Sequence, residues 1–165
     1  LPITLIGKAV GQVYYQKAAN LMANSKSFNQ LFKSNVSFLA LISLPLFLFI
    51  SLTAKTIYPI FFGSQWLIAG EIAQFYVLAA GMSFISIPLE RSALVINAWW
   101  YGPLWYLLRV MTTIIVIWIA YALDYSFINF IFILTIQIAA MHFFDLIASF
   151  LFSLRNKPFE SETHG

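Results

Sequence analysis

The sequence predicts an all-α, polytopic transmembrane helix bundle, and its composition and the length of its apolar runs predict this class. Of 165 residues, 61% are hydrophobic and only 9% are charged, whereas a soluble domain carries roughly 25% charged residues to face water. The uncharged runs are longer than the alternating strands of about ten residues that build a membrane barrel. Only helices and closed barrels can span a bilayer, so helices remain.

Four segments are long and apolar enough to cross the hydrocarbon core, which needs about 20 residues. They lie at about residues 36–58, 67–97, 104–123 and 127–154. Pro45 and Pro88 fall inside two of them and are expected to kink or interrupt the helix. Both prolines are candidate hinges for alternating access, although prolines without that role are common in membrane helices.

The remaining segments are more polar. Residues 1–21 are predicted to be the end of a transmembrane helix that faces something polar, and residues 22–35 a cytoplasmic interfacial loop or short helix. Residues 155–165 form a polar tail that we expect to be disordered. The chain begins abruptly on apolar residues without a charged leader, so we expect a fragment whose upstream part is missing.

The basic residues predict the orientation. Hairpin ends alternate between two sides, and one side receives Lys17, Lys26, Lys33, Arg91, Arg109, Arg155 and Lys157 whereas the other receives Lys55. An excess of lysine and arginine marks the cytoplasmic side. The loop at 22–35, the aromatic turn near residue 100 and the C-terminus are therefore predicted to be cytoplasmic, and the turns near residues 63 and 124 to face outward.

Lys8 is the leading candidate for a substrate-binding residue. Lys8, Gln12 and Gln16 follow i, i+4 spacing and share one helix face. Gly7 and Gly11 lie beside them and permit close approach of a backbone or ligand. A lysine–glutamine stripe suits an anionic, hydrogen-bonding cargo, because charges inside membranes usually face a wet interior. The alternative is that Lys8 reaches an interface along its aliphatic stem.

Arg91 and Arg109 flank the aromatic turn and are candidates for a cytoplasmic gate or a lipid-headgroup clamp. Each is about six residues from the turn, hence about 9 Å by helix rise. An arginine side chain can reach an interface over that distance, so simple snorkelling is the favoured alternative. Glu90 is a candidate ion-pair partner of either arginine.

His142 and Asp145 are three residues apart on the last helix and therefore share a face. Both can titrate, so they are candidates for ion coupling through a proton relay. The favoured alternative is a pair of polar side chains satisfied by helix packing.

Other chemistry lacks support in the sequence. The chain has no cysteine, which excludes disulfides and thiolate metal sites. The second histidine, His164, lies in the tail, and no nucleotide-binding loop, zinc-binding histidine pair or serine elbow is present. We therefore expect no enzymatic activity, no cofactor, no metal site and no nucleic-acid partner.

Three segments resemble a known family. Residues 5–18 (LIGKAVGQVYYQKA), 62–70 (FGSQWLIAG) and 84–89 (FISIPL) are similar in order and spacing to segments of bacterial polysaccharide biosynthesis proteins. These are the O-antigen and capsule flippases of the multidrug/oligosaccharidyl-lipid/polysaccharide exporter superfamily. One departure is Asn97-Ala98-Trp99-Trp100, where members often carry glycine and basic residues, so no role for a basic residue there is carried over.

The resemblance implies the C-terminal part of a 12-helix, two-lobe transporter in the bacterial inner membrane, with residues 1–21 as the end of helix 8 beside a central cavity. The implied cargo is undecaprenyl-pyrophosphate-linked oligosaccharide, flipped by alternating access. Expected partners are membrane lipid, this cargo, and polysaccharide polymerase and chain-length proteins. A drug exporter of the same superfamily is the first alternative, followed by a membrane polymerase or glycosyltransferase and by a structural membrane subunit.

Overall fold

The computed structural model describes residues 2–155 and 157–158, and within them all regular structure is helical. This confirms the predicted all-helical class. The elements are α1 (Pro2–Ala23), α2 (Asn29–Phe62), the 3₁₀ turn η1 (Ser64–Trp66), α3 (Leu67–Ser86), α4 (Ser92–Val95), α5 (Tyr101–Ala122) and α6 (Phe127–Ser153). Four of the described helical segments are long and apolar enough to span a membrane: α2, η1 with α3, α5 and α6.

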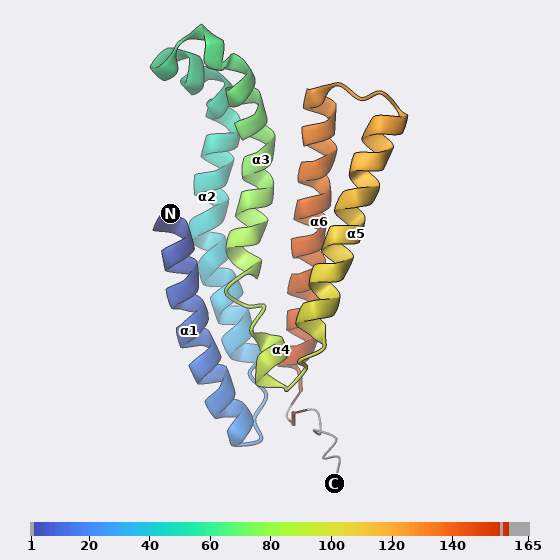
Figure 1. Ribbon diagram of the computed structural model, residues 1–165. Coiled ribbons are helices and arrows are strands. Elements are labelled where there is room, and N and C mark those ends of the chain that lie inside the picture. The colour runs from blue at the N-terminus through green and yellow to red at the C-terminus, as the bar shows by residue number, and fades with distance from the viewer. Residues whose placement is uncertain (1, 156, 159–165) are drawn as a thin grey trace.

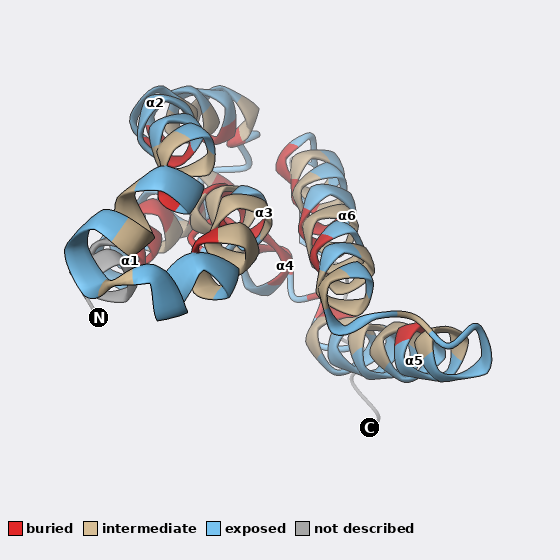
Figure 2. Cartoon of the chain, turned by 90° about the horizontal axis from the view of Figure 1, so that it is seen from above, coloured by how far each residue is buried: buried red, intermediate tan, exposed pale blue. Residues whose placement is uncertain are grey.

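The long helices run side by side (Figure 1), and α3 occupies the central position (Figure 2). It packs against α2 on one side and α6 on the other, while α5 packs against α6. The α2–α3 and α5–α6 connections lie at one end of the bundle. The α1–α2 connection, α4 and the end of α6 lie at the other end, which we call the α4 end.

The outer surface of the long helices is apolar. Leu41 on α2 and Tyr121 on α5 are 74% and 86% exposed, and most other large apolar side chains of α2, α5 and α6 are also exposed. A soluble monomer rarely leaves so much contiguous apolar surface in water. Such a surface is stable in lipid, where the helices satisfy their own backbone hydrogen bonds.

The structure corrects two of the sequence-based boundaries. The predicted interfacial segment at 22–35 is not a separate element, because α1 continues to Ala23 and residues 29–35 are the start of α2. The 34 residues of α2 correspond to about 51 Å at a rise of 1.5 Å per residue. That exceeds the hydrocarbon thickness of about 30 Å, so α2 must extend beyond the core or tilt. The polar residues of 29–35 lie at the N-terminal end of this long helix.

The second correction concerns the third predicted helix, which ends at Ser86 rather than near residue 97. Pro88 has no backbone N–H to donate to the Phe84 carbonyl oxygen, so the helical hydrogen-bond pattern is interrupted there, and the helix ends at Ser86 with Ile87 as its C-cap in αR geometry. Residues 87–100 then form turns around the short α4, and Asn97 adopts a positive φ of 61°. Pro45, by contrast, lies within the continuous α2. The predicted disordered tail falls largely on residues outside the described part of the chain.

The segment 87–100, although irregular, is the best-buried part of the α4 end. Leu89, Ser92 and Ile96 are each fully buried. They join a core formed with α1, the first half of α2 and the start of α5. Buried irregular backbone is tolerated at membrane depth only inside protein, and here α1 and α6 pack against α4. This segment positions the side chains of the candidate site.

Candidate functional site

Helix α1 has one packed face and one open face. Gly7, Gly11, Tyr14 and Ala18 are buried, at the i, i+4, i+7 spacing of a single helix stripe. A Cβ on Gly11 would lie 3.2 Å from the Pro88 carbonyl oxygen. Because Gly11 has no side chain, the backbone of the 87–100 segment can approach α1 closely at this position, as the sequence predicts.

One hydrogen bond and one aromatic contact orient α1. The Tyr14 hydroxyl and the Ser92 hydroxyl are 2.6 Å apart, and Ser92 also donates to the Leu89 carbonyl oxygen at 2.7 Å. The Tyr14 ring meets Phe28 edge-on, with 6.3 Å between ring centroids. Because these contacts define which face of α1 is inward, they also define which face points away from the chain.

The open face carries the predicted substrate-binding stripe. Lys8, Gln12 and Gln16 are all exposed. The stripe continues into a shallow hollow of about 430 Å³ at the α4 end, lined by Gln16, Lys17, Asn20, Leu21 and Leu31. Within the described part of the chain, this polar face is therefore directed outward and is accessible to a further element or a ligand.

Asp145 is the most buried charged side chain of the candidate site, at 1% exposure. Its Oδ2 accepts a hydrogen bond from the Ser86 hydroxyl at 2.5 Å, and its Oδ1 accepts one from the Tyr101 hydroxyl at 2.8 Å. The three residues come from α6, the end of α3 and the start of α5. A carboxyl group removed from water is stabilised by such donors, so Asp145 links three helices at the level where α3 breaks.

Aromatic rings hold Tyr101 in position for this contact. Its ring stacks on Trp105 at 5.7 Å with an interplanar angle of 13°, and Phe152 of α6 meets it edge-on at 5.0 Å. Offset-stacked and edge-on pairs are the preferred aromatic geometries. The hydroxyl is thus presented to Asp145 by rings from α5 and α6 together.

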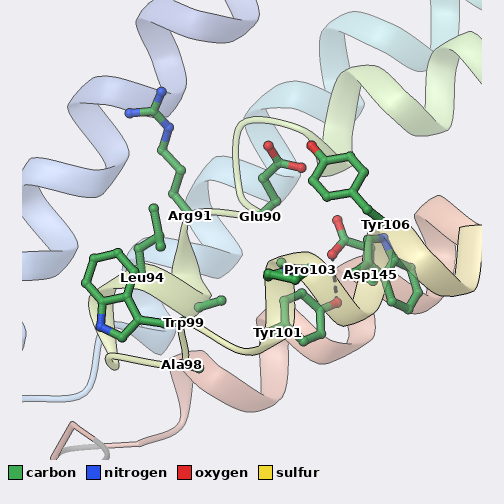
Figure 3. A pocket seen from close by; sticks show the side chains of 12 residues that line it. Glu90, Arg91, Leu94, Ala98, Trp99, Tyr101, Pro103, Tyr106 and Asp145 are labelled. Carbon is green, nitrogen blue, oxygen red and sulfur yellow. Dashed lines mark hydrogen bonds between the residues drawn. The ribbon is translucent and has the colours of Figure 1, made fainter. Parts of the chain in front are cut away.

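A pocket of about 490 Å³ opens beside this network (Figure 3). It is lined by residues of the 87–100 segment, the first turns of α5, and Asp145. The lining side chains that carry charge or an aromatic ring are Glu90, Arg91, Trp99, Tyr101, Trp105, Tyr106 and Asp145. In Figure 3 the Glu90 carboxylate and the Tyr106 hydroxyl point toward one another. The pocket therefore combines negative charge with aromatic walls.

Glu90 lies at the mouth of this pocket, and its environment disfavours the ionised form. By surface area Glu90 is exposed, yet the helices around it exclude enough solvent that desolvation is the largest influence and raises the pKa of Glu90. The Asp145 carboxylate raises this pKa further, while Arg91 and Arg109 act in the opposite direction. A cation placed in the pocket would relieve this unfavourable negative charge.

Arg91 and Arg109, the candidates for a cytoplasmic gate or headgroup clamp, line different hollows. Arg91 lies on the rim of the 490 Å³ pocket, and its side chain extends away from Glu90 in Figure 3. Arg109 lines a separate, shallow hollow of α5 with Val110, Thr113 and Ile114. The structure therefore does not bring both arginines to a single pocket.

His142 and Asp145 share a face of α6, as their spacing predicts, and both are buried. The hydrogen bonds of Asp145 go to Ser86 and Tyr101 rather than to His142. Among the residues that the structure describes, no three histidine, aspartate or glutamate side chains cluster as metal ligands would.

Sequence reasoning missed Ser86, Tyr101, Tyr14 and Ser92 as members of polar contacts. A signal for two of them existed, since a buried aspartate in a membrane helix requires hydroxyl or amide donors. The sequence offers many serines and tyrosines, however, and the choice among them depends on where α3 ends and how α5 packs. That choice is a property of the tertiary structure.

Comparisons with known proteins support a family at a coarse level. Residues 1–71 match a family model described as "Polysaccharide biosynthesis protein". The matched region covers α1, α2 and the first residues of α3. Together with the four apolar helices, the match supports a multi-pass membrane protein of a polysaccharide biosynthesis family. Comparison with curated proteins and with solved structures finds no match.

Proposed function

We propose that this chain is the C-terminal part of a transporter that flips undecaprenyl-pyrophosphate-linked oligosaccharide across the bacterial inner membrane by alternating access. The family match over residues 1–71 supports a role in polysaccharide synthesis or export. The apolar, lipid-compatible exterior supports action inside the bilayer. We propose no enzymatic step for the chain.

The observation that carries this proposal is the open polar face of α1. Lys8, Gln12 and Gln16 are exposed on a helix whose opposite stripe is firmly packed. Lysine is a point-charge ligand for phosphate, and the glutamine amides supply donors and acceptors for sugar hydroxyls. An anionic headgroup with an attached oligosaccharide has the chemistry that this stripe recognises. In the complete transporter, the stripe would line the passage between two lobes.

The proposed orientation places the α4 end and the C-terminus in the cytoplasm. Lys17, Lys26, Lys33 and Arg91 all belong to elements at the α4 end. At the opposite end Lys55 is paired with Glu71, with 2.6 Å between Nζ and Oε1. Since an excess of lysine and arginine favours the cytoplasmic side, this distribution supports the proposal. Polysaccharide polymerase and chain-length proteins are the proposed partners on the same pathway.

Lys8→Ala in the full-length protein tests the proposal. Losing a charge-assisted hydrogen bond costs about 1.5–3 kcal/mol, so we expect transport of the polyprenyl-pyrophosphate oligosaccharide into the outer leaflet of proteoliposomes to slow roughly tenfold or more. Surface polysaccharide should fall in parallel, and Lys8→Arg should retain most activity. The matched control is Lys26→Ala, which removes an exposed lysine from the α1–α2 connection.

Both membrane abundance and flipping must be measured in each variant. A Lys8→Ala protein that accumulates normally and flips at the normal rate would remove Lys8 from the cargo path. If Gln12→Ala and Gln16→Ala are also normal, the stripe has no role in binding cargo and the proposed function loses its main structural support.

A further inference from the structure

The pocket beside α4 has a chemistry different from that of the proposed cargo stripe. None of Lys8, Gln12 and Gln16 lines it. We propose that this pocket binds the headgroup of an amine-bearing phospholipid of the phosphatidylethanolamine class, with the ammonium between Glu90 and the aromatic wall and the phosphate toward Arg91. This lipid site is separate from the proposed cargo stripe.

The walls of the pocket suit an ammonium ion. Trp99, Trp105 and Tyr106 supply aromatic rings, and cations are attracted to the faces of such rings, most strongly to tryptophan. Glu90 supplies a carboxylate at the mouth. Both carboxyl oxygens of Asp145 already accept hydrogen bonds. Asp145 therefore contributes negative electrostatic potential to the pocket but does not bind the ammonium directly. Desolvation and Asp145 together raise the pKa of Glu90, and a bound cation would compensate for both.

Arg91 supplies the opposite charge on another part of the rim. Glu90 and Arg91 are adjacent in sequence, yet among the described residues no ion pair joins them, and their side chains diverge (Figure 3). A zwitterionic headgroup carries its ammonium and its phosphate a few bonds apart. The separated acid and base of this pocket are arranged to meet both ends of such a group, whereas an anionic headgroup without an amine would leave Glu90 without a counter-charge.

The position of the pocket fits a lipid rather than a soluble ligand. It lies where α5 begins, at the end of a membrane-spanning helix. Trp99 and Trp100 are 68% and 55% exposed beside it, and tryptophan concentrates at the level of lipid headgroups. Its volume of about 490 Å³ falls within the roughly 300–1,000 Å³ of small-molecule sites. A headgroup could enter sideways while its acyl chains remain against the apolar surface of α5.

The test is lipid binding to the full-length protein, measured by native mass spectrometry after delipidation and titration with phosphatidylethanolamine or phosphatidylglycerol. We expect Glu90→Gln to weaken phosphatidylethanolamine binding roughly tenfold, because a charge-assisted contact is lost, without weakening phosphatidylglycerol binding. Trp99→Ala should weaken the same lipid. The matched controls are Glu71→Gln and Trp66→Ala at the opposite end of the bundle, which should bind it as the unmodified protein does.

Three results would overturn the inference. Equal affinity of the unmodified protein for the two lipids would show no selection for the amine. Normal phosphatidylethanolamine binding by folded Glu90→Gln and Trp99→Ala proteins would place the lipid elsewhere. Competition by free phosphoethanolamine at concentrations comparable with the lipid would indicate a soluble ligand instead. None of these outcomes depends on oligosaccharide flipping, so the proposed function can fail or succeed independently.

Discussion

Tyr101→Phe isolates the contribution of one hydrogen bond to the junction of α3, α5 and α6. The substitution removes the hydroxyl that donates to Asp145 Oδ1 at 2.8 Å. It keeps the ring that stacks on Trp105 and meets Phe152. Any change in stability therefore reports the hydrogen bond rather than the aromatic packing.

The expected cost follows from the burial of Asp145, which is 1% exposed. Hydrogen bonds to charged groups contribute about 1.5–3 kcal/mol, whereas side-chain hydrogen bonds between membrane helices average about 0.6 and reach about 1.7 kcal/mol. We expect about 1.5 kcal/mol for Tyr101→Phe. Because Ser86 donates to the other oxygen of the same carboxyl group, the double variant with Ser86→Ala should lose more stability than the sum of the single variants.

The assay is reversible unfolding of the full-length protein in mixed detergent micelles, followed by helical circular dichroism. The matched control is Tyr121→Phe, because Tyr121 is 86% exposed near the end of α5. If Tyr101→Phe costs no more than Tyr121→Phe, or if its effect adds independently to that of Ser86→Ala, the Asp145 network does not tie the three helices together.

Two further predictions concern the packing of α1 and the charge of the pocket. Gly11→Ala should destabilise the protein by about 1 kcal/mol net. The new Cβ would lie 3.2 and 3.3 Å from Pro88 backbone atoms, and such overpacking costs about 1–3 kcal/mol. This cost outweighs the gain in helix propensity from replacing glycine by alanine, which is about 1 kcal/mol. Gly102→Ala, with no atom within 4 Å of its Cβ, should be neutral or stabilising in the same unfolding assay; equal losses at both glycines would refute the close approach. Phosphatidylethanolamine binding should weaken on acidification, because the raised pKa of Glu90 means that its carboxylate takes up a proton at a higher pH than an ordinary glutamate. The groups facing Glu90 are Asp145 of α6, Arg109, Tyr101 and Tyr106 of α5, and Arg91 of its own segment. Glu90→Gln should abolish the pH dependence of lipid binding measured by mass spectrometry, and a dependence that persists in this variant would assign it to another of these groups.

Part of the candidate site was predictable because it follows helix periodicity. The spacing of Lys8, Gln12 and Gln16 predicts a single stripe, and that stripe is found on one exposed face of α1. The small residues beside it predict a close contact, and Gly11 makes one. The identity of the partner, the Pro88 backbone 77 positions later in the chain, was not predictable, because it depends on how the 87–100 segment folds back.

The end of α3 shows a second kind of limit. Pro88 predicted an interruption but not its size, and the predominantly apolar stretch to residue 97, in which Glu90 and Arg91 are the charged residues after Pro88, favoured a single long helix. In the structure the chain leaves the helix at Ser86, and residues 87–100 bury Leu89 and Ile96 inside the bundle. Hydropathy cannot distinguish this buried turn from a spanning helix, because both are apolar; only packing against α1 and α6 separates them.

The sequence by itself determined the structural class, a bundle of helices, and the surrounding medium, a lipid bilayer. With 9% charged residues the chain cannot cover itself for water, and its apolar runs require self-satisfied helices in lipid. What only the tertiary structure decided is which polar groups meet: Asp145 with Ser86 and Tyr101, Tyr14 with Ser92, and Glu90 with an aromatic pocket. Hydrophobic burial depends on how many apolar residues a segment contains, whereas a hydrogen bond requires two particular atoms within about 3 Å, and that proximity exists only after the helices have packed.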